Sequence, residues 1–211
     1  PRAAAVAGIL FAILYGTGLV LIRLAIPADS TADGGAWLET NARAVDLALN
    51  LVPYAGIAFL WFIGVIRDRL GNVEDRFFAT VFLGSGLLFL ALTFAGAAMA
   101  GGLLTSYAVA PRAIIESGVF TYGREVMFHI INVYAVRMAG VFMISLSTIW
   151  IRTGLMHRGW AFVTYALALV LLVSIGYSLW VSLIFAGWVF AVSGYYLLRS
   201  RGVQPLEAES K

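Results

Sequence analysis

Long apolar runs, separated by short clusters of charged residues, dominate the pattern of this chain. A helix needs about 20 mostly apolar residues to cross the roughly 30 Å hydrocarbon core of a bilayer. In chain order, the first four runs of at least this length are Ala4–Ile26, Val45–Ile66, Phe77–Gly101 and Val126–Ile151. We therefore predict one membrane-spanning helix in each of these four runs.

The last apolar stretch, residues 160–198, carries no charge and is about twice as long as one span requires. We predict that it turns back at Gly176-Tyr177-Ser178, because glycine accepts turn geometry and tyrosine suits a membrane interface. Two further spans then cover about 160–176 and 179–198. The predicted fold is all-α, a single bundle of six transmembrane helices over residues 1–211. The alternative is five spans, with the last stretch forming one long tilted helix.

The segment between the third and fourth spans is more than a simple loop. Pro111 begins the short apolar stretch of residues 111–116, and proline is favoured at the first position of a helix, where its missing N–H is not needed. We predict a short interfacial helix in this third loop, on the outer face.

Basic residues orient the bundle, because cytoplasmic loops are enriched in Lys and Arg. If the N-terminus is cytoplasmic, the inner side holds Arg2, Arg67, Arg69, Arg76, Arg152, Arg158, Arg199, Arg201 and Lys211. The outer side then holds the smaller group of Arg23, Arg43, Arg112 and Arg124. We therefore predict that both termini are cytoplasmic.

Composition agrees with a membrane protein, since 62% of the residues are hydrophobic and 12% are charged. Every basic residue except Lys211 is arginine, a bias that favours a GC-rich bacterial genome and hence a bacterial inner membrane. The net charge of +3 is scattered over the segment ends, so no nucleic-acid partner is expected.

The first run is too long for the apolar core of a signal peptide. Pro1 is the residue expected after removal of an initiator methionine, so we expect the chain to be nearly complete.

Polar residues gather at one end of the fourth predicted span. Glu125, His129 and Asn132 are separated by four and then three residues, which places them on one face of a helix. Arg137 borders that face. Ionisable groups inside a membrane are costly and are therefore candidates for a functional role.

The second span runs in the same direction and carries Asp46 and Asn50 at its corresponding end. The sequence predicts an outward-facing pocket that is walled by the first, second and fourth spans. Its candidate residues are Arg23, Asp46, Asn50, Glu125, His129, Asn132 and Arg137. Asp46 and Glu125 are the expected partners of Arg137. The alternative is structural anchoring, in which Arg137 extends its side chain to the lipid headgroups.

Small residues recur every four positions along the first span, at Ala4, Gly8, Ala12 and Gly16. Such a stripe lets helix backbones approach closely. It serves either packing within the bundle or a seam between two copies of the chain in a homo-oligomer.

No recognisable motif for catalysis, metal binding or cofactor binding is present. A retinal Schiff base requires a lysine in a helix, and the chain has only Lys211 near its end. His129 and His157 lie about 40 Å apart along a helix, so one protomer does not supply both ligands of a bis-histidine haem. The chain has no cysteine, and GxSxG, P-loop and HExxH motifs are missing. We therefore predict no catalytic residue, no metal and no cofactor, and we expect bound lipid.

Two segments resemble a known group of proteins. Residues 145–160 include Arg152-Thr153-Gly154 and end at Trp160, and residues 59–89 include Ile66-Arg67-Asp68-Arg69. Both resemble an uncharacterised family of small multi-pass membrane proteins that is common in actinobacteria. Proline often stands there at the position of His157. The resemblance implies the same topology and carries no established activity.

These features favour an accessory, scaffold or lipid-binding subunit of a membrane assembly. Its partners would be membrane lipids, other membrane subunits or a second copy of the chain. One alternative is a small-solute channel or permease that uses the polar pocket, and another is an intramembrane lipid-modifying enzyme with Glu125 or His129 as acid or base. A channel needs a polar path to the inner face. Beyond Arg137 the fourth span offers only Ser145, Ser147 and Thr148, which favours the first hypothesis.

Overall fold

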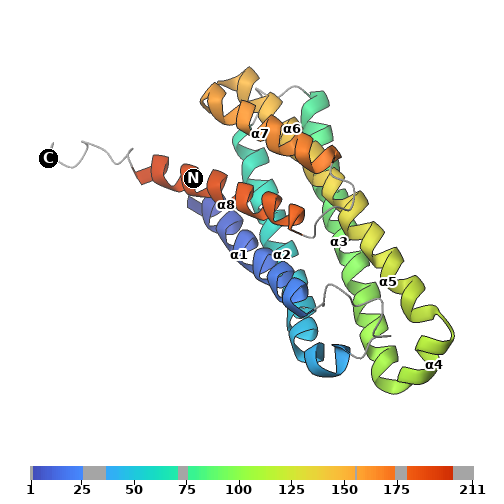
Figure 1. Ribbon diagram of the computed structural model, residues 1–211. Coiled ribbons are helices and arrows are strands. Elements are labelled where there is room, and N and C mark those ends of the chain that lie inside the picture. The colour runs from blue at the N-terminus through green and yellow to red at the C-terminus, as the bar shows by residue number, and fades with distance from the viewer. Residues whose placement is uncertain (1, 26–36, 71–75, 155, 174–179, 202–211) are drawn as a thin grey trace, which may run out of the picture.

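The computed structural model describes residues 2–25, 37–70, 76–154, 156–173 and 180–201. These residues form helices and short connections without any strand, which confirms the predicted all-α class. The helices are α1 (Arg2–Ala25), α2 (Trp37–Leu70), α3 (Arg76–Val109), α4 (Pro111–Glu116), α5 (Val119–His129), α6 (Val136–Thr153), α7 (Arg158–Val173) and α8 (Val181–Arg201) (Figure 1). A π-helical segment, η2 (Ile130–Ala135), joins α5 to α6.

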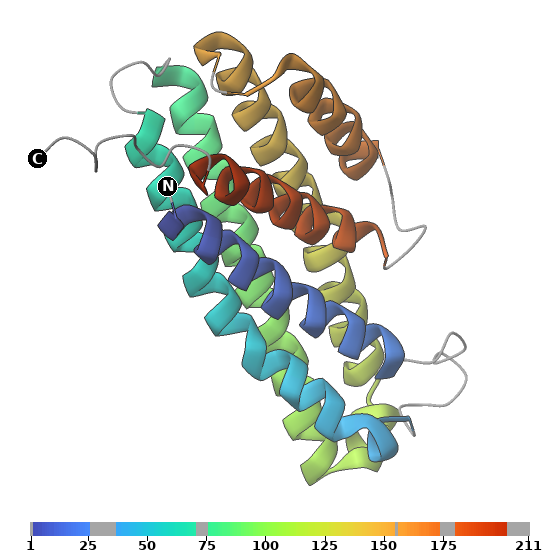
Figure 2. The same ribbon diagram turned by 90° about the vertical axis from the view of Figure 1, so that its left-hand side faces the viewer.

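Three long helical rods give the bundle its elongated shape (Figure 2). α2 and α3 have 34 residues each, and α5, η2 and α6 together form a continuous helix of 35 residues. Each rod is about 50 Å long, whereas α1 is about 36 Å long. The rods therefore extend beyond the end of α1, and α4 lies there (Figure 1). We call this the α4 end of the bundle, and the side with the α6–α7 connection the opposite end.

Five helices of the described chain are long and apolar enough to cross a membrane. They are Ala3–Ala25, Thr40–Asp68, Phe77–Val109, Val119–Thr153 and Val181–Leu198. α7 is also apolar, but its 16 residues span only about 24 Å. The described residues thus support a helical membrane protein with five full-length candidate spans and one shorter apolar helix, where the sequence predicted six spans.

The last apolar stretch forms two separate helices rather than one long tilted helix. α7 packs mainly against α6, and α8 packs mainly against α1. The two are linked by a hydrogen bond in which Trp188 Nε1 donates to Thr164 Oγ1 at 2.9 Å. The predicted turn at residues 176–178 lies outside the described residues.

An aromatic core joins the two halves of the bundle. Phe11, Phe59, Phe89, Phe142 and Phe185 come from five different helices, and all are fully buried. The ring of Phe59 lies 4.6 Å from that of Phe11, 5.4 Å from that of Phe89 and 5.3 Å from that of Phe142. Helices in lipid gain little from the hydrophobic effect, so close packing of large side chains is what holds them together.

The small-residue stripe of α1 faces this core at its first half. A side chain added at Gly8 would meet Ser193 of α8 and would come within 2.7 Å of the Phe62 ring of α2. At Gly16 the nearest atom is the Ala186 Cβ at 3.9 Å, and an open apolar groove begins there between α1 and α8. Gly8 therefore serves packing within the molecule, while a homo-oligomer seam along the stripe stays a prediction.

The α4 end is closed by a second, smaller hydrophobic cluster. α4 begins at Pro111 as the sequence predicted, and Gly118 adopts a left-handed φ of 74° that turns the chain into α5. The buried members of this cluster are Ala25, Trp37, Val45, Tyr107, Ile114 and Phe120. The position of α4 at a membrane interface stays a prediction.

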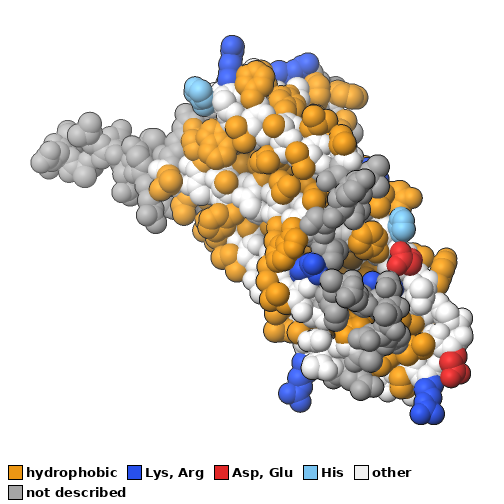
Figure 3. All heavy atoms as spheres, in the orientation of Figure 1, with side chains coloured by type: hydrophobic (Ala, Val, Ile, Leu, Met, Phe, Trp, Pro, Cys, Tyr) orange, Lys and Arg blue, Asp and Glu red, His pale blue; other side chains and the backbone are white. Residues whose placement is uncertain are grey.

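The face of the molecule in Figure 3 shows an apolar region between two charged ends, as a membrane helix bundle requires. Basic side chains lie at the opposite end, charged side chains of both signs lie toward the α4 end, and hydrophobic side chains cover the region between them (Figure 3). Trp61, Phe162 and Leu169 are among the large apolar residues that remain 60% or more exposed. Such exposure is unfavourable in water and favourable in hydrocarbon.

Candidate functional site: an amphipathic pocket

A cavity of about 240 Å³ lies between α1, α2, α3, α5 and η2. It exists because α1 packs against α2 and α8 and makes no extensive contact with α5 or η2. We call it the amphipathic pocket. Its lining residues are Leu14, Tyr15, Gly18, Leu19, Ile22, Arg23, Leu49, Val52, Thr93, Ala97, Ala100, Arg124, Glu125, Met127, Phe128, Ile131 and Asn132.

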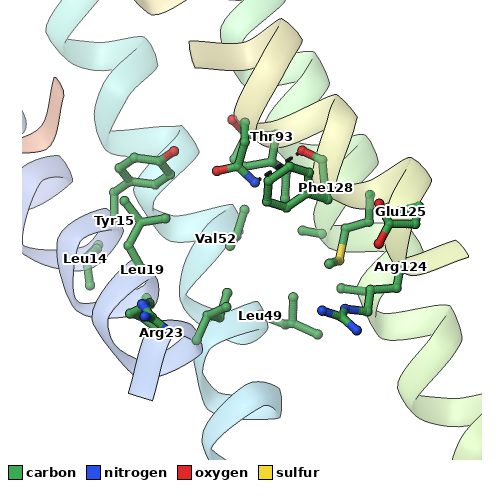
Figure 4. A pocket seen from close by; sticks show the side chains of 17 residues that line it. Leu14, Tyr15, Leu19, Arg23, Leu49, Val52, Thr93, Arg124, Glu125 and Phe128 are labelled. Atoms are coloured by element: carbon green, nitrogen blue, oxygen red, sulfur yellow. Dashed lines mark hydrogen bonds between the residues drawn. The ribbon is translucent and has the colours of Figure 1, made fainter. Parts of the chain in front are cut away.

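The pocket has a polar floor, an apolar body and a basic rim. Tyr15 and Thr93 lie at one end, and Arg23 and Arg124 lie at the other (Figure 4). Eight residues separate Tyr15 from Arg23 on α1, and eight separate Asn132 from Arg124 on the antiparallel rod, which is about 12 Å in each case. The two rim arginines therefore reach the same level from different helices.

The rim arginines differ in their surroundings. Arg23 is half-buried in the last turn of α1, and its guanidinium carbon lies 5.9 Å from the centre of the Trp180 ring. This cation–π contact holds the side chain at the rim. Arg124 is also half-buried and points toward the pocket (Figure 4). Within the described ranges, no hydrogen bond or ion pair satisfies its guanidinium.

The polar floor is held largely by bonds to nearby backbone. Thr93 Oγ1 donates to the Phe89 carbonyl at 2.8 Å, and the buried Tyr15 side chain lies beside Thr93. Asn132 Nδ2 donates to the Phe128 carbonyl at 3.2 Å (Figure 4, dashed line). Asn132 belongs to η2, and π-helical segments of this kind are frequent at functional sites because they change which side chains face inward.

Three of the seven residues predicted from sequence line this pocket: Arg23, Glu125 and Asn132. Glu125 is exposed and lies at the edge, whereas Asn132 is half-buried. The predicted wall of the first, second and fourth spans is present, and α3 completes it with Thr93, Ala97 and Ala100.

The other four predicted residues lie elsewhere. Asn50 Nδ2 donates to the Asp46 carbonyl at 2.9 Å and to its carboxylate at 3.2 Å, and both residues are exposed on α2. His129 is exposed, and its Nδ1 lies 2.8 Å from the Glu125 carbonyl. Arg137 donates from Nη1 to the Val133 carbonyl of its own rod at 3.4 Å. Neither Asp46 nor Glu125 binds it in the structure.

The difference has a simple geometric cause. The rod lines the pocket with Arg124, Glu125, Met127, Phe128, Ile131 and Asn132. At 100° per residue, the middle of this set is the face of Arg124, Phe128 and Ile131, which follow the helical spacing of four and three. Glu125 is one residue from Arg124 and so lies about 100° farther around the helix. The predicted face of Glu125, His129 and Asn132 is therefore rotated by part of a turn from the middle of the lining face. Glu125 and Asn132 still line the pocket, and His129 does not.

Three polar lining residues were not predicted: Tyr15, Thr93 and Arg124. A search for charge inside the spans overlooks Tyr15 and Thr93, which are neutral. The spacing of Arg124, Phe128 and Ile131 was the available signal, because it describes an apolar face with a basic residue at its end. Among the described residues, no group of three His, Cys, Asp or Glu side chains comes together as a metal site.

Comparison with known proteins returns no family model that matches the chain, no similar curated protein and no similar solved structure.

Proposed function

We propose that this protein is a membrane-embedded, lipid-binding accessory or scaffold subunit, and that the amphipathic pocket holds one bound lipid. The observation that carries the proposal is the polarity of this pocket. Its body is apolar and lies between helices, and its rim bears Arg23 and Arg124. A lipid has the matching division into hydrocarbon and headgroup.

The depth of the pocket in a bilayer supports the proposal. Twenty residues of helix cover about 30 Å of hydrocarbon. Counted from Ala4 along α1, that distance ends close to Arg23, and Arg124 on the antiparallel rod lies at the same level. The rim is therefore near the edge of the hydrocarbon, at the level of the headgroups. The apolar body of the pocket falls within the outer part of the hydrocarbon.

The volume of the pocket also favours an occupant. An apolar cavity of about 150 Å³ is enough to bind benzene in a soluble protein. The amphipathic pocket is larger, at about 240 Å³, and its walls lose packing contacts if it stays empty. Lipid chains are the most abundant apolar molecules around a membrane bundle.

The proposed topology has six membrane-crossing segments, both termini in the cytoplasm of a bacterial cell, and the pocket facing outward. The excess of arginine at the opposite end supports this orientation. α1 and α8 run antiparallel side by side, which brings the start of α1 and the end of α8 to the same side (Figures 1 and 2). In this arrangement α7 and α8 form the final hairpin.

The channel and enzyme alternatives have less support. Thr93 lies one helical turn from Phe89, and the aromatic core of Phe59, Phe89 and Phe142 continues from there toward the opposite end. That core interrupts a polar path from the pocket. His129, a candidate acid or base, is exposed and does not line the pocket.

The test is lipid retention by a pocket-filling variant. Ala97 lines the pocket and Ala98 is exposed on the same helix, so Ala97→Phe fills the cavity while Ala98→Phe is a matched control. Each protein is purified in mild detergent, and lipid per protein is measured by mass spectrometry. We expect wild type and Ala98→Phe to retain about one more lipid per chain than Ala97→Phe. Equal retention by the two variants, both folded by circular dichroism, would contradict the proposal.

A further inference from the structure

Beyond a lipid site in general, we infer that the amphipathic pocket selects an amphiphile with an anionic headgroup, which Arg23 and Arg124 clamp between α1 and α5. This inference rests on the proposed function and adds the chemical class of the ligand. It is carried by the charges at the rim, the burial of Arg124 and the separation of the rim from the apolar body.

The charge balance of the rim favours an anion. Two guanidiniums and one carboxylate, that of Glu125, are the charged groups among the described lining residues. Glu125 is exposed, so water screens its charge, whereas both arginines are half-buried. A zwitterionic headgroup would bring its ammonium toward the two arginines, and an anionic headgroup avoids that repulsion.

The surroundings of Arg124 also favour an anionic ligand. A half-buried guanidinium has five N–H donors and loses part of its hydration. Within the part of the chain that the structure describes, no carboxylate or carbonyl compensates for this loss. Phosphate and carboxylate oxygens match the guanidinium fork in a two-bonded geometry, and such charge-assisted bonds are among the strongest that side chains form.

The geometry of the clamp also favours an anionic amphiphile. Arg23 is held by its contact with Trp180 on one side of the cavity, and Arg124 points toward the pocket from the other side (Figure 4). Below them about 12 Å of apolar wall separates the rim from Tyr15 and Asn132. The site therefore fits an anionic group that continues directly into a hydrocarbon chain, and a small free anion would leave the body of the pocket unfilled.

The experiment measures which lipid the protein retains from a defined mixture. The full chain is placed in nanodiscs that contain equal amounts of phosphatidylglycerol and phosphatidylcholine, then extracted into detergent, and its bound lipids are quantified by mass spectrometry. We expect the bound lipid to contain about ten times as much phosphatidylglycerol as phosphatidylcholine, as strong charge-assisted bonds imply. Raising the salt concentration should reduce the enrichment.

Variants distinguish an effect of the rim arginines on lipid enrichment from an effect of surface charge in general. Arg124→Gln and Arg23→Gln should each lower the enrichment several-fold, whereas Arg112→Gln, which removes an exposed arginine outside the pocket, should leave it unchanged. Glu125→Gln removes the only lining carboxylate of the described pocket and should raise the enrichment. Arg124→Lys keeps the charge and should retain part of it. This last variant guards against misreading a folding defect.

The outcomes distinguish the two proposals. If wild type retains no more lipid than Ala97→Phe, the proposed function fails. If lipid is retained but its composition equals that of the mixture, or if Arg124→Gln and Arg112→Gln behave alike, lipid binding stands and the anionic clamp is overturned. A parallel arm with palmitate and hexadecanol identifies the source of the anion. Arginine-dependent enrichment of palmitate would assign the site to a fatty acid, and enrichment of phosphatidylglycerol alone would assign it to a phospholipid.

Discussion

Arg124 and Arg137 lie on one helical rod, but the surroundings of their side chains differ. Arg124 points toward the amphipathic pocket near the start of the rod, which the proposed topology places at the level of the headgroups. Arg137 lies 13 residues farther along, about 20 Å deeper. It is half-buried and reaches back one turn to the Val133 carbonyl. Only the first is placed to meet a ligand.

From this difference we predict how Arg137→Leu changes the stability of the protein. We expect the free energy of unfolding to change by less than about 1 kcal/mol or to rise, because no buried carboxylate is left without a partner and leucine suits hydrocarbon. Thermal unfolding in detergent measures the effect. A loss of several kcal/mol would contradict this expectation and would favour the ion pair with Asp46 or Glu125 that the sequence predicted.

At the level of helices, close contact of α1 with α2 and α8 is what leaves room for the pocket on the other side of α1. The contact depends on position along the small-residue stripe. Gly8 has no space for a side chain, and Gly16 has space. The two glycines therefore form a matched pair on one helix.

We predict that Gly8→Ala destabilises the bundle by about 1–3 kcal/mol, because Phe62 and Ser193 must move to admit the added methyl group. Gly16→Ala should be neutral, or slightly stabilising since alanine favours helix. Unfolding in a graded series of denaturing detergent compares the two. Equal effects would mean that α1 is not held by close approach at Gly8.

For the whole molecule, the bundle has two ends of different character. The α4 end extends beyond α1 and carries the short helix α4 and a small hydrophobic cluster, and the rim of the pocket lies toward this end. The opposite end consists of helix termini and the α6–α7 connection, where His157 and Arg158 are exposed.

The chain has no cysteine, so single cysteines report the orientation directly. We expect a membrane-impermeant maleimide to label Glu116→Cys on intact cells, because α4 faces outward in the proposed topology. His157→Cys should react only after the membrane is permeabilised. Both positions are exposed, so a difference in labelling reflects sidedness. The reverse pattern would invert the proposed topology.

Much of the architecture follows from local properties of the sequence. Whether a helix can span a membrane depends on the summed hydropathy of about 20 consecutive residues. The positions of α1, α2, α3 and the α5–α6 rod can therefore be predicted without knowing which helices pack against one another. The start of α4 is equally local, because Pro111 is suited to a first helical turn. The division of 160–198 into two helices follows from its excess length.

Only the tertiary structure decided which faces of these helices meet. Periodicity shows that Glu125, His129 and Asn132 share a face, but it does not show how the rod is rotated against α1 and α3. That rotation is set by packing of large side chains such as Phe59 and Phe142, and it turns Arg124 toward the cavity. It also brings Tyr15 and Thr93, which are far apart in the chain, to one floor. The sequence by itself determined a membrane bundle with a polar region near one end, whereas its pocket depends on contacts between distant residues that no local pattern records.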